Sequence, residues 1–281
     1  MFKKPPLPLF GNKSSLSKAI VEQLKKFKNK GIKIIIDLFG GTGIVSRLAA
    51  SLFPECLVIY NDYGDMFYTQ RLKQIPRTNE VLQQIYSIGD KYKLKPYKPI
   101  KNEDAKREIL DTINDDDDIL TIATWLLFSG HAPPTTKDDL CKMVLWYKPR
   151  KTPIDETDTN DWILDNMKVV HEDWWDLYNR FHAPEQNDGV LWIADPPYFN
   201  TTNRQYGGYS LDLTDYIKMM ALFKSSHVML FSNNNNMQQL CQAMKDNFNI
   251  DDLHIPEMVK LGKKAINYST NVFDTVAIVN V

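Results

Sequence analysis

The chain of 281 residues carries 34 Lys and Arg against 35 Asp and Glu, which gives a formal net charge of −1 at pH 7. This balance excludes a histone-like polycation but not a nucleic-acid enzyme, because affinity for phosphate follows local basic patches rather than total charge. Hydrophobic residues make up 43% of the chain, enough for a sizeable core in one or two domains and too many for general disorder.

The three cysteines (Cys56, Cys141 and Cys241) lie far apart and form no CxxC pair. We therefore expect neither a disulfide framework nor a metal site. The N-terminus has lysines but no apolar segment of the kind found in signal peptides, and the apolar stretch 119–128 is too short to cross a membrane. These features predict a soluble, cytoplasmic protein.

Charge is unevenly distributed along the chain. Nine lysines and a single acid lie between positions 3 and 33, and ten basic residues lie between positions 71 and 107. Acidic runs follow at 115–118 and 155–165. A charged run is usually a solvated face, but two basic segments also allow contacts with a phosphate backbone.

The first predicted elements alternate between helix and strand. Apolar periodicity predicts a helix over 14–30 with Ser14 as its cap. A β-branched apolar run predicts a buried strand over 32–38, followed by a glycine-rich turn, a helix over 44–52 and a strand over 57–60. This order is typical of the start of a nucleotide-binding α/β fold.

The middle of the chain differs from both ends. From about 66 to 146 the pattern is mainly helical, with apolar stretches at 81–88, 109–113, 119–128 and 140–146 around a Lys- and Pro-rich loop at 91–101. Strands are predicted at 167–170, 190–194, 228–232 and 272–281, the last as part of a C-terminal strand pair, and helices at 173–181, 212–223 and 237–248. We predict one Rossmann-like α/β core from residues 1–65 and 166–281, with a mainly helical insertion over 66–165.

The first chemical motif is the glycine-rich segment from Asp37 to Gly43 after the first strand. Glycines there allow a sharp turn and close approach to a ligand. Ser46 stands where a dinucleotide-binding loop would have its third glycine, which weakens that interpretation. Asp62 lies 19 positions after Gly43, near the offset of an acid that binds ribose hydroxyls. Many such loops are simple turns, so this motif alone leaves the function open.

The second motif is sharper: the predicted strand 190–194 leads directly into Asp195-Pro196-Pro197-Tyr198. The prolines end the strand and offer no N–H, so the segment presents acceptors, namely the Asp195 carboxylate and the Pro196 carbonyl. Tyr198 adds a flat ring. This combination suits a planar ligand with an amino group, and its place at a strand's carboxyl end favours that over a plain proline turn.

An ordered set of motifs now identifies a resemblance. The set comprises Phe10-Gly11-Asn12-Lys13, Asp37–Gly43, Asn61-Asp62, Asp195–Tyr198 and Ser232-Asn233. In this order the chain resembles the D12-class N6-adenine DNA methyltransferases, the family that includes the Dam enzymes of bacteria and T-even phages. The resemblance implies a Rossmann-like methyltransferase core, S-adenosylmethionine as methyl donor and an adenine flipped out of double-stranded DNA as substrate, with no metal.

The resemblance also assigns roles to particular residues. Lys13 would lie near the methionine carboxylate of the cofactor. Asp62 would hold the ribose hydroxyls of the cofactor, and the segment His171–Asp173 would contact the cofactor's adenine ring, with Asp173 as the best match. The implied cofactor pocket comprises Phe10, Lys13, Asp37, Phe39, Gly40, Gly41, Gly43, Asp62, His171, Asp173 and Asp195. The implied catalytic residues around the target base are Asp195, Pro196, Pro197 and Tyr198.

The insertion is the expected site of DNA recognition. Candidate DNA contacts are Arg71, Lys73, Arg77, Lys91, Lys93, Lys95, Lys98 and Lys101, together with Tyr206 and Tyr209 in a polar loop that could close on a flipped base. Three alternatives stay open. An RNA N6-adenine methyltransferase would have similar pockets, a nucleotide-dependent oxidoreductase would use the glycine loop but leave Asp195–Tyr198 unexplained, and a DNA-binding relative could lack catalysis.

Overall fold

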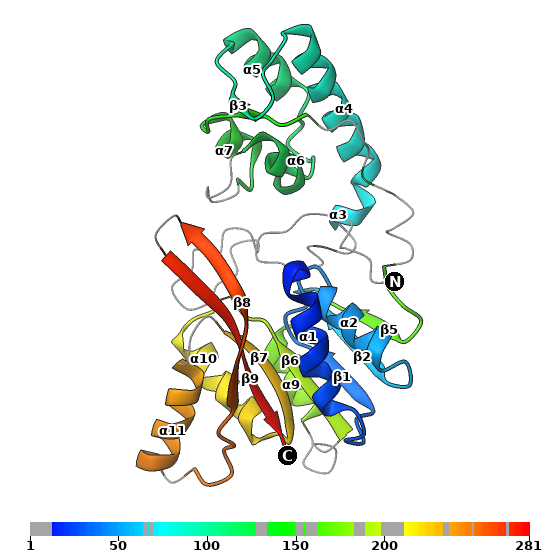
Figure 1. Ribbon diagram of the computed structural model, residues 1–281. Helices are drawn as coiled ribbons and strands as arrows, with labels where there is room; N and C mark the ends of the chain where they lie inside the picture. Colours follow the sequence, from blue (N-terminus) through cyan, green and yellow to red (C-terminus); the bar gives the residue numbers. More distant parts are fainter. Residues whose placement is uncertain are drawn as a thin grey trace.

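The computed structural model of the protein describes residues 13–63, 67, 70–127, 134–149, 154, 162–182, 189–197, 211–232, 236–248, 250–267 and 270–281. Strands in these ranges form a seven-stranded sheet of order β5-β2-β1-β6-β7-β9-β8 (Figure 1). Strands β5 to β7 in this order are parallel, whereas β9 and β8 add an antiparallel pair at one edge. The bounds are Ile34–Asp37 (β1), Leu57–Asn61 (β2), Met167–Val170 (β5), Val190–Ala194 (β6), His227–Ser232 (β7), Glu257–Asn267 (β8) and Thr270–Asn280 (β9). The α/β fold expected from the sequence is confirmed.

Helices cover both faces of this sheet, which is why its central strands are apolar nearly throughout. Alternate side chains point to opposite faces: Ile35 joins one buried cluster and Ile36 the other. The first face packs against α1 (Ser17–Leu24) and α2 (Ile44–Leu52), and the second against α9 (Trp174–Phe181), α10 (Leu213–Met219) and α11 (Asn236–Phe248).

The helix starts follow local capping chemistry. Asp173 caps α9, and Asp212 and Asp215 form a reciprocal capping box at α10. The predicted cap at Ser14 is wrong: Ser14 begins a short 3₁₀ turn (Ser14–Leu16), and α1 starts at Ser17, whose hydroxyl donates to the Ser14 carbonyl at 2.6 Å. Further 3₁₀ turns follow α1 at Lys25–Phe27 and α10 at Met220–Lys224.

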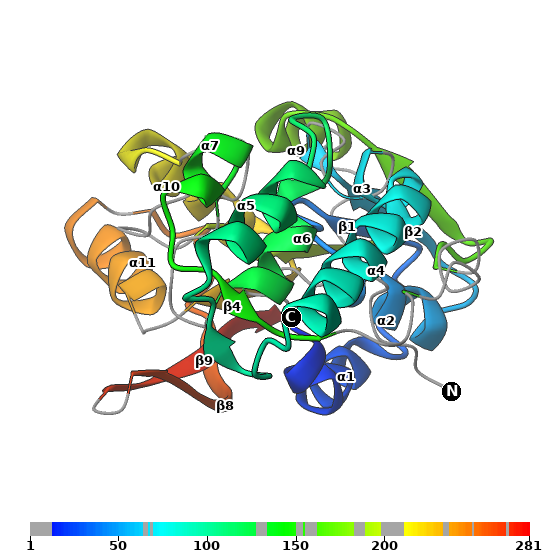
Figure 2. The ribbon, with the colours of Figure 1, turned by 90° about the horizontal axis from the view of Figure 1, so that it is seen from above.

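The insertion has a hydrophobic cluster of its own, from Phe67 to Ile154. It contains α3 (Gln70–Lys73), α4 (Ile75–Lys91), α5 (Glu103–Asp111), α6 (Ile119–Leu126), α7 (Lys137–Cys141) and a small antiparallel pair of β3 (Lys98–Pro99) and β4 (Trp146–Tyr147). Seen from above, these elements lie over the edge of the sheet at which the parallel strands end (Figure 2). The expected domain boundaries remain a prediction.

Two further details of the predicted elements are wrong. The expected helix over 140–146 ends at Cys141, and Trp146 instead begins β4. The patterns also locate only the second member of the C-terminal strand pair, whereas β8 is as long as β9 and pairs along its length with two register shifts. Within the part of the chain that the structure describes, no helix is long and apolar enough to cross a membrane.

Candidate active site at the carboxyl edge of the sheet

The strand order reverses next to β1, because β2 and β5 lie on one side of it and β6 and β7 on the other. Open α/β sheets bind ligands outside the carboxyl ends of the strands at such a reversal. Asp37 ends β1 and pairs in register with Ile193 of β6, so the glycine loop and Asp195 leave the sheet side by side. The two motifs found in the sequence therefore meet at one place.

The glycine loop has a specific requirement at each of three positions. A Cβ at Gly40 would lie 2.2 Å from the Tyr60 ring, so that position must lack a side chain. Gly41 and Gly43 have φ values of 51° and 70°, in the left-handed region. The Gly43 N–H donates to the Gly40 carbonyl at 2.8 Å, and the Gly40 N–H donates to the Asn61 carbonyl at 3.0 Å. The loop is thus a fixed, close-packed turn.

Asp37 is buried, with 1% of its surface exposed. Its Oδ2 accepts a hydrogen bond from the Ser46 hydroxyl at 2.6 Å, whereas its Oδ1 has no partner among the described residues. Burial, together with the charge of Asp195, raises the pKa of Asp37 to about 7 against the opposing hydrogen bond from Ser46. A buried carboxylate oxygen of this kind is suited to a donor or cation supplied by a ligand.

Asp195 is paired with Lys13, which reaches it from before the first helix. The Lys13 Nζ lies 2.6 Å from Oδ2 and 2.8 Å from Oδ1 of Asp195, and 5.4 Å from the centre of the Phe231 ring. The lysine side chain is 6% exposed and the aspartate 22%. The structure thus brings together two predicted site residues, although the sequence did not suggest that they contact each other.

Asn61 connects three loops at this edge. Its side-chain amide donates to the Leu38 carbonyl at 3.0 Å and to the Glu172 carbonyl at 2.9 Å, and its Oδ1 accepts from the Glu172 N–H at 3.0 Å. These partners follow β1 and β5, while Asn61 itself ends β2. Asn61 is therefore a positioning residue for the site edge, a role that its place in a motif did not specify.

Asp62 and His171 lie together at the ends of β2 and β5. Asp62 is 3% exposed, and both its carboxylate oxygens lie 3.1 Å from the Phe67 N–H. The His171 Nδ1 lies 2.8 Å from the Asp62 carbonyl oxygen. The buried acid at the end of the second strand is thus where the sequence places it, and it also holds the first described residue of the insertion.

The remaining predicted cofactor residues have visible packing roles. The Asp173 Oδ1 accepts from the Trp175 N–H at 2.8 Å as the cap of α9, so its carboxylate already has a structural function. The Phe39 ring packs at 5.7 Å from the Trp174 ring. These contacts place both residues beside the glycine loop and α9, and they leave the predicted cofactor contacts as predictions.

Tyr216 is a further residue of the site, one that no sequence motif indicated. Its hydroxyl, on α10, donates to the Pro197 carbonyl and so fixes the chain just after Asp195 and Pro196. Burial raises the pKa of Tyr216 to about 12, with a smaller contribution from the charge of Asp215, so the hydroxyl keeps its proton at neutral pH. No local pattern distinguishes this tyrosine from the other twelve.

Some predicted site residues lie outside the described part of the chain, so their roles stay predictions. These are Phe10, Tyr198, Tyr206 and Tyr209.

Two of the predicted DNA contacts have carboxylate partners inside the insertion. Arg71 is 7% exposed, its Nε lies 3.0 Å from the Asp118 Oδ2, and its guanidinium also bonds to Thr121. Arg77 Nε lies 2.9 Å from Asp117 Oδ1, and hydrogen bonding to Asp117 raises the pKa of Arg77. The Arg71 guanidinium is largely buried against its carboxylate, whereas the Arg77 side chain is 35% exposed. Both guanidinium groups have a structural role in the insertion, and their contacts with DNA stay predictions.

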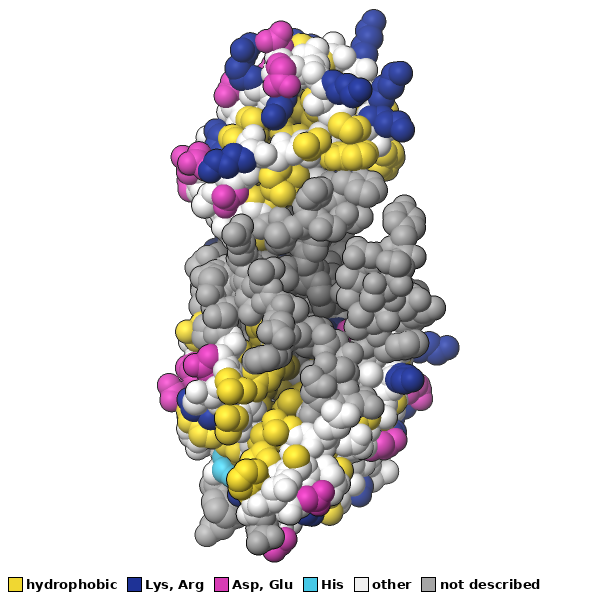
Figure 3. Space-filling model, turned by 90° about the vertical axis from the view of Figure 1, so that its left-hand side faces the viewer, with side chains coloured by type: hydrophobic (Ala, Val, Ile, Leu, Met, Phe, Trp, Pro, Cys, Tyr) yellow, Lys and Arg dark blue, Asp and Glu magenta, His cyan; other side chains and the backbone are white. Residues whose placement is uncertain are grey.

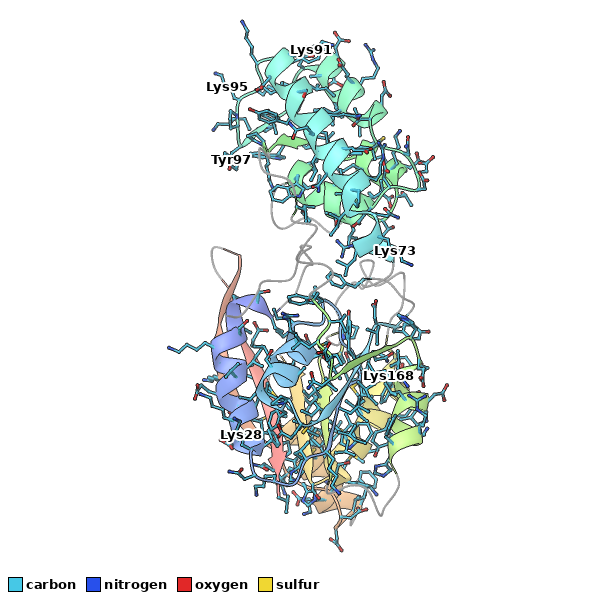
Figure 4. All side chains as sticks on the ribbon, turned by 90° about the vertical axis from the view of Figure 1, so that its right-hand side faces the viewer. Lys28, Lys73, Lys91, Lys95, Tyr97 and Lys168 are labelled. Carbon is cyan, nitrogen blue, oxygen red and sulfur yellow. The ribbon has the colours of Figure 1, made fainter. Side chains whose placement is uncertain are left out.

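The insertion lysines that were predicted to contact DNA are all exposed. They are Lys73, Lys91, Lys93, Lys95, Lys98 and Lys101. Lys91 Nζ lies 2.7 Å from Glu108 Oε2. Figure 3 shows Lys and Arg side chains on the upper part of the insertion, with Asp and Glu among them, and Figure 4 places Lys91 and Lys95 far from the sheet and Lys73 at the end of the insertion nearer to it. Lys73 is thus the labelled insertion lysine nearest the site edge.

Two further features revise the charge pattern. Lys28 lies at the end of the sheet opposite the insertion (Figure 4), so this part of the N-terminal basic segment does not border the site.

Tyr97 is 66% exposed between the lysines of the 91–101 loop, and it donates its N–H to the Tyr147 carbonyl at 2.7 Å. An exposed aromatic ring among lysines is a candidate for stacking on a base, and that spacing was visible in the sequence.

Comparisons with known proteins identify the family of the chain. The family model described as D12 class N6 adenine-specific DNA methyltransferase matches residues 10–254. A Haemophilus influenzae protein named "Putative methyltransferase" is 31% identical over 238 residues, which cover 82% of this chain and 76% of that protein. The resemblance noted in the sequence is confirmed, and it favours DNA over RNA and methyl transfer over oxidoreduction. The chain belongs to the D12 class of N6 adenine-specific DNA methyltransferases.

Proposed function

We propose that the protein transfers a methyl group from S-adenosylmethionine to the N6 amino group of an adenine in double-stranded DNA, with the donor on the glycine loop and the base on Asp195 and Pro196. The observation that carries this proposal is the juxtaposition of Asp37 and Asp195 at the adjacent ends of β1 and β6. The first has a buried oxygen with no hydrogen-bond partner in the described part of the chain, and the second begins the motif with acceptors for an amino group.

The residues at this edge fit the donor. S-adenosylmethionine carries a positive sulfonium and an ammonium group, and Asp37 and Asp195 supply negative charge next to a loop without side chains at three positions. Lys13 can bond a carboxylate, and Asp62 supplies a buried acid at the end of the neighbouring strand for ribose hydroxyls. When bound, the donor supplies a methyl group on a positively charged sulfur.

The residues also fit an adenine. The lone pair of its amino nitrogen is delocalised into the ring, which makes the nitrogen a poor nucleophile. Hydrogen bonds from the two N–H groups to the Asp195 carboxylate and the Pro196 carbonyl would favour a tetrahedral nitrogen with its lone pair available. Such bonds strengthen as positive charge develops in the transition state, so they accelerate the reaction. Lys13 orients the same carboxylate.

The DNA is the remaining partner. A base inside a duplex cannot reach this edge, so it must leave the stack at a cost of a few kcal/mol. We assign target recognition to the insertion, which lies over the site edge in Figure 2 and exposes lysines and Tyr97. Its phosphate contacts supply salt-dependent affinity that does not depend on sequence.

The test is transfer of a tritiated methyl group from S-adenosylmethionine to duplex DNA, single-stranded DNA and RNA of mixed sequence. Wild type should label duplex DNA at N6 of adenine, and Asp195→Ala should label none while keeping its circular dichroism spectrum. Asp252→Ala is the matched control, because Asp252 is exposed and pairs with Lys224, 2.8 Å away. Full activity of Asp195→Ala, or labelling of RNA alone, would overturn the proposal.

A further inference from the structure

Trp162 lies in an unexpected place. It falls within the predicted insertion, four positions before the expected return to the core at residue 166, yet it is fully buried in the cluster between the sheet and α2. It is the first residue of the described segment that leads from the insertion back to β5. Its ring therefore packs beneath the glycine loop rather than in the insertion.

The indole contacts the backbone of that loop directly. The Trp162 Nε1–H donates to the Thr42 carbonyl at 3.0 Å, and the Tyr60 hydroxyl donates to the preceding carbonyl, that of Gly41, at 2.6 Å. Two successive carbonyls of the loop are thus held from below by aromatic side chains. Because a trans peptide directs its C=O and N–H to opposite sides, holding the Gly41 carbonyl also fixes the direction of the Thr42 N–H.

Trp162 is itself held by a buried arginine of α2. The Arg47 guanidinium lies 4.8 Å from the centre of the Trp162 ring and donates to the Trp162 carbonyl, and Arg47 is 8% exposed. On its other side the indole nitrogen would lie 3.1 Å from a Cβ at Gly43. The ring is therefore packed between α2 and the loop.

We infer that Trp162 is a positioning residue of the methyl-donor site, one that sets the conformation of the glycine loop from the segment returning from the insertion. The inference rests on the proposed function, in which that loop binds the donor. The hydrogen bond from a fully buried indole keeps the Thr42 carbonyl satisfied, and loss of the bond would leave a buried carbonyl free to turn. A loop free to turn must be reordered when the donor binds, so affinity falls.

The decisive variant is Trp162→Phe, which removes the N–H but keeps a ring for Arg47 to stack on. Trp192→Phe is the matched control: Trp192 is also fully buried, and its Nε1 has no hydrogen-bond partner among the described residues. Binding of S-adenosylhomocysteine to the full chain is measured by isothermal titration calorimetry. Loss of one hydrogen bond predicts about 10-fold weaker binding for Trp162→Phe and less than about 2-fold change for Trp192→Phe.

Kinetics separate positioning from general damage. Trp162→Phe should raise KM for S-adenosylmethionine by a similar factor while kcat at saturating donor falls less, because the catalytic groups are intact. If Trp162→Phe does not fold, Arg47→Lys releases the Trp162 carbonyl without changing the ring and should weaken binding about 3-fold. Equal affinities of the Trp162 and Trp192 variants, or an unchanged Arg47→Lys in that case, would overturn the inference. Absence of binding by wild type would instead refute the proposed function.

Discussion

Lys13 Nζ lies 2.6 Å from the carboxylate of Asp195, a residue 182 positions away in the sequence. The pair joins the segment before α1 to the segment after β6, and it is largely shielded from water. An ion pair in such a position is worth more through the orientation it gives a carboxylate than through stability, because desolvation offsets much of the attraction. The contact thus ties the N-terminal segment to the proposed base-binding motif.

The first prediction concerns this pair. Lys13→Ala should lower kcat/KM for methyl transfer roughly 100-fold, because a misplaced acceptor loses its alignment with the amino group. Lys13→Arg should recover part of the loss, since it restores a cation. Lys18→Ala, on the exposed side of α1, is the matched control and should be near wild type. Radiometric assays on duplex DNA measure all three, and normal activity of Lys13→Ala would contradict the role.

A second prediction concerns Asp37 and pH. Its pKa rises from 3.8 to about 7 in the folded protein, so between these values the folded state binds more protons than the unfolded chain. The free energy of unfolding must therefore fall as pH rises from about 4 to about 7. Asp37→Asn imitates the protonated side chain and should lose this dependence, whereas Asp165→Asn, at an exposed position, should keep it. Urea unfolding at pH 5 and pH 8 gives the free energy of unfolding of each protein at both pH values. An equal change in this free energy between the two pH values for wild type and Asp37→Asn would refute the prediction.

A third prediction concerns proton release. A cation placed beside Asp37 lowers the pKa of that carboxyl, so binding of S-adenosylmethionine near pH 7 should release a fraction of a proton. Calorimetry in phosphate and in Tris measures the release, since the two buffers differ in ionisation enthalpy. Asp37→Asn should show none. Proton uptake by wild type, or equal release by the variant, would show that another group titrates.

The fourth prediction concerns Tyr216. Tyr216→Phe removes the hydroxyl that donates to the Pro197 carbonyl and should lower kcat about 10-fold, while affinity for S-adenosylhomocysteine changes little. Tyr178→Phe removes a comparable buried hydroxyl, bonded to the Ala221 carbonyl at 3.1 Å, from a place away from the site. Rapid-quench single-turnover assays with both variants distinguish a loss of positioning at the site from a general loss of stability. Similar rates for the two would assign Tyr216 to stability alone.

A fifth prediction concerns the insertion lysines. Lys73 lies at the end of the insertion nearer the site edge, whereas Lys91 is farther away and pairs with Glu108. Lys73→Glu should weaken DNA binding at all sequences and reduce the slope of log K against log salt by about 1, because one phosphate contact is lost. Lys91→Glu should have the smaller effect. Fluorescence anisotropy over a series of salt concentrations measures the DNA affinity of both variants. A greater loss of affinity for Lys91→Glu than for Lys73→Glu would contradict the prediction.

The elements predicted most accurately are those whose ends are set by neighbouring residues. The helix Ile44–Leu52 and the strand Val190–Ala194 have the expected bounds, because glycines start the one and a proline pair ends the other. The meeting of Asp37 and Asp195 could also be expected, since parallel strands end at one edge. These features depend on short segments of sequence and on the general rule that parallel strands end at the same edge of a sheet.

Contacts between distant segments could not be predicted in the same way. Nothing in the sequence pairs Lys13 with Asp195 or Trp162 with Thr42. The acidic run 115–118 resembled a solvated face, yet Asp118 neutralises Arg71 inside the insertion. A charge pattern does not show which charges cancel internally, and for that reason the basic surface is smaller than the residue counts suggested.

Both described crossings between sheet and insertion contact the proposed donor pocket. Phe67 donates its N–H to the Asp62 carboxylate at one crossing, and Trp162 donates to the Thr42 carbonyl at the other. If DNA bound to the insertion fixes its orientation, as the proposed function implies, binding also acts on the end of β2 and on the glycine loop after β1, where the donor would bind. Thermodynamic linkage then requires reciprocity: if DNA tightens binding of the donor, the donor must tighten binding of DNA by the same factor.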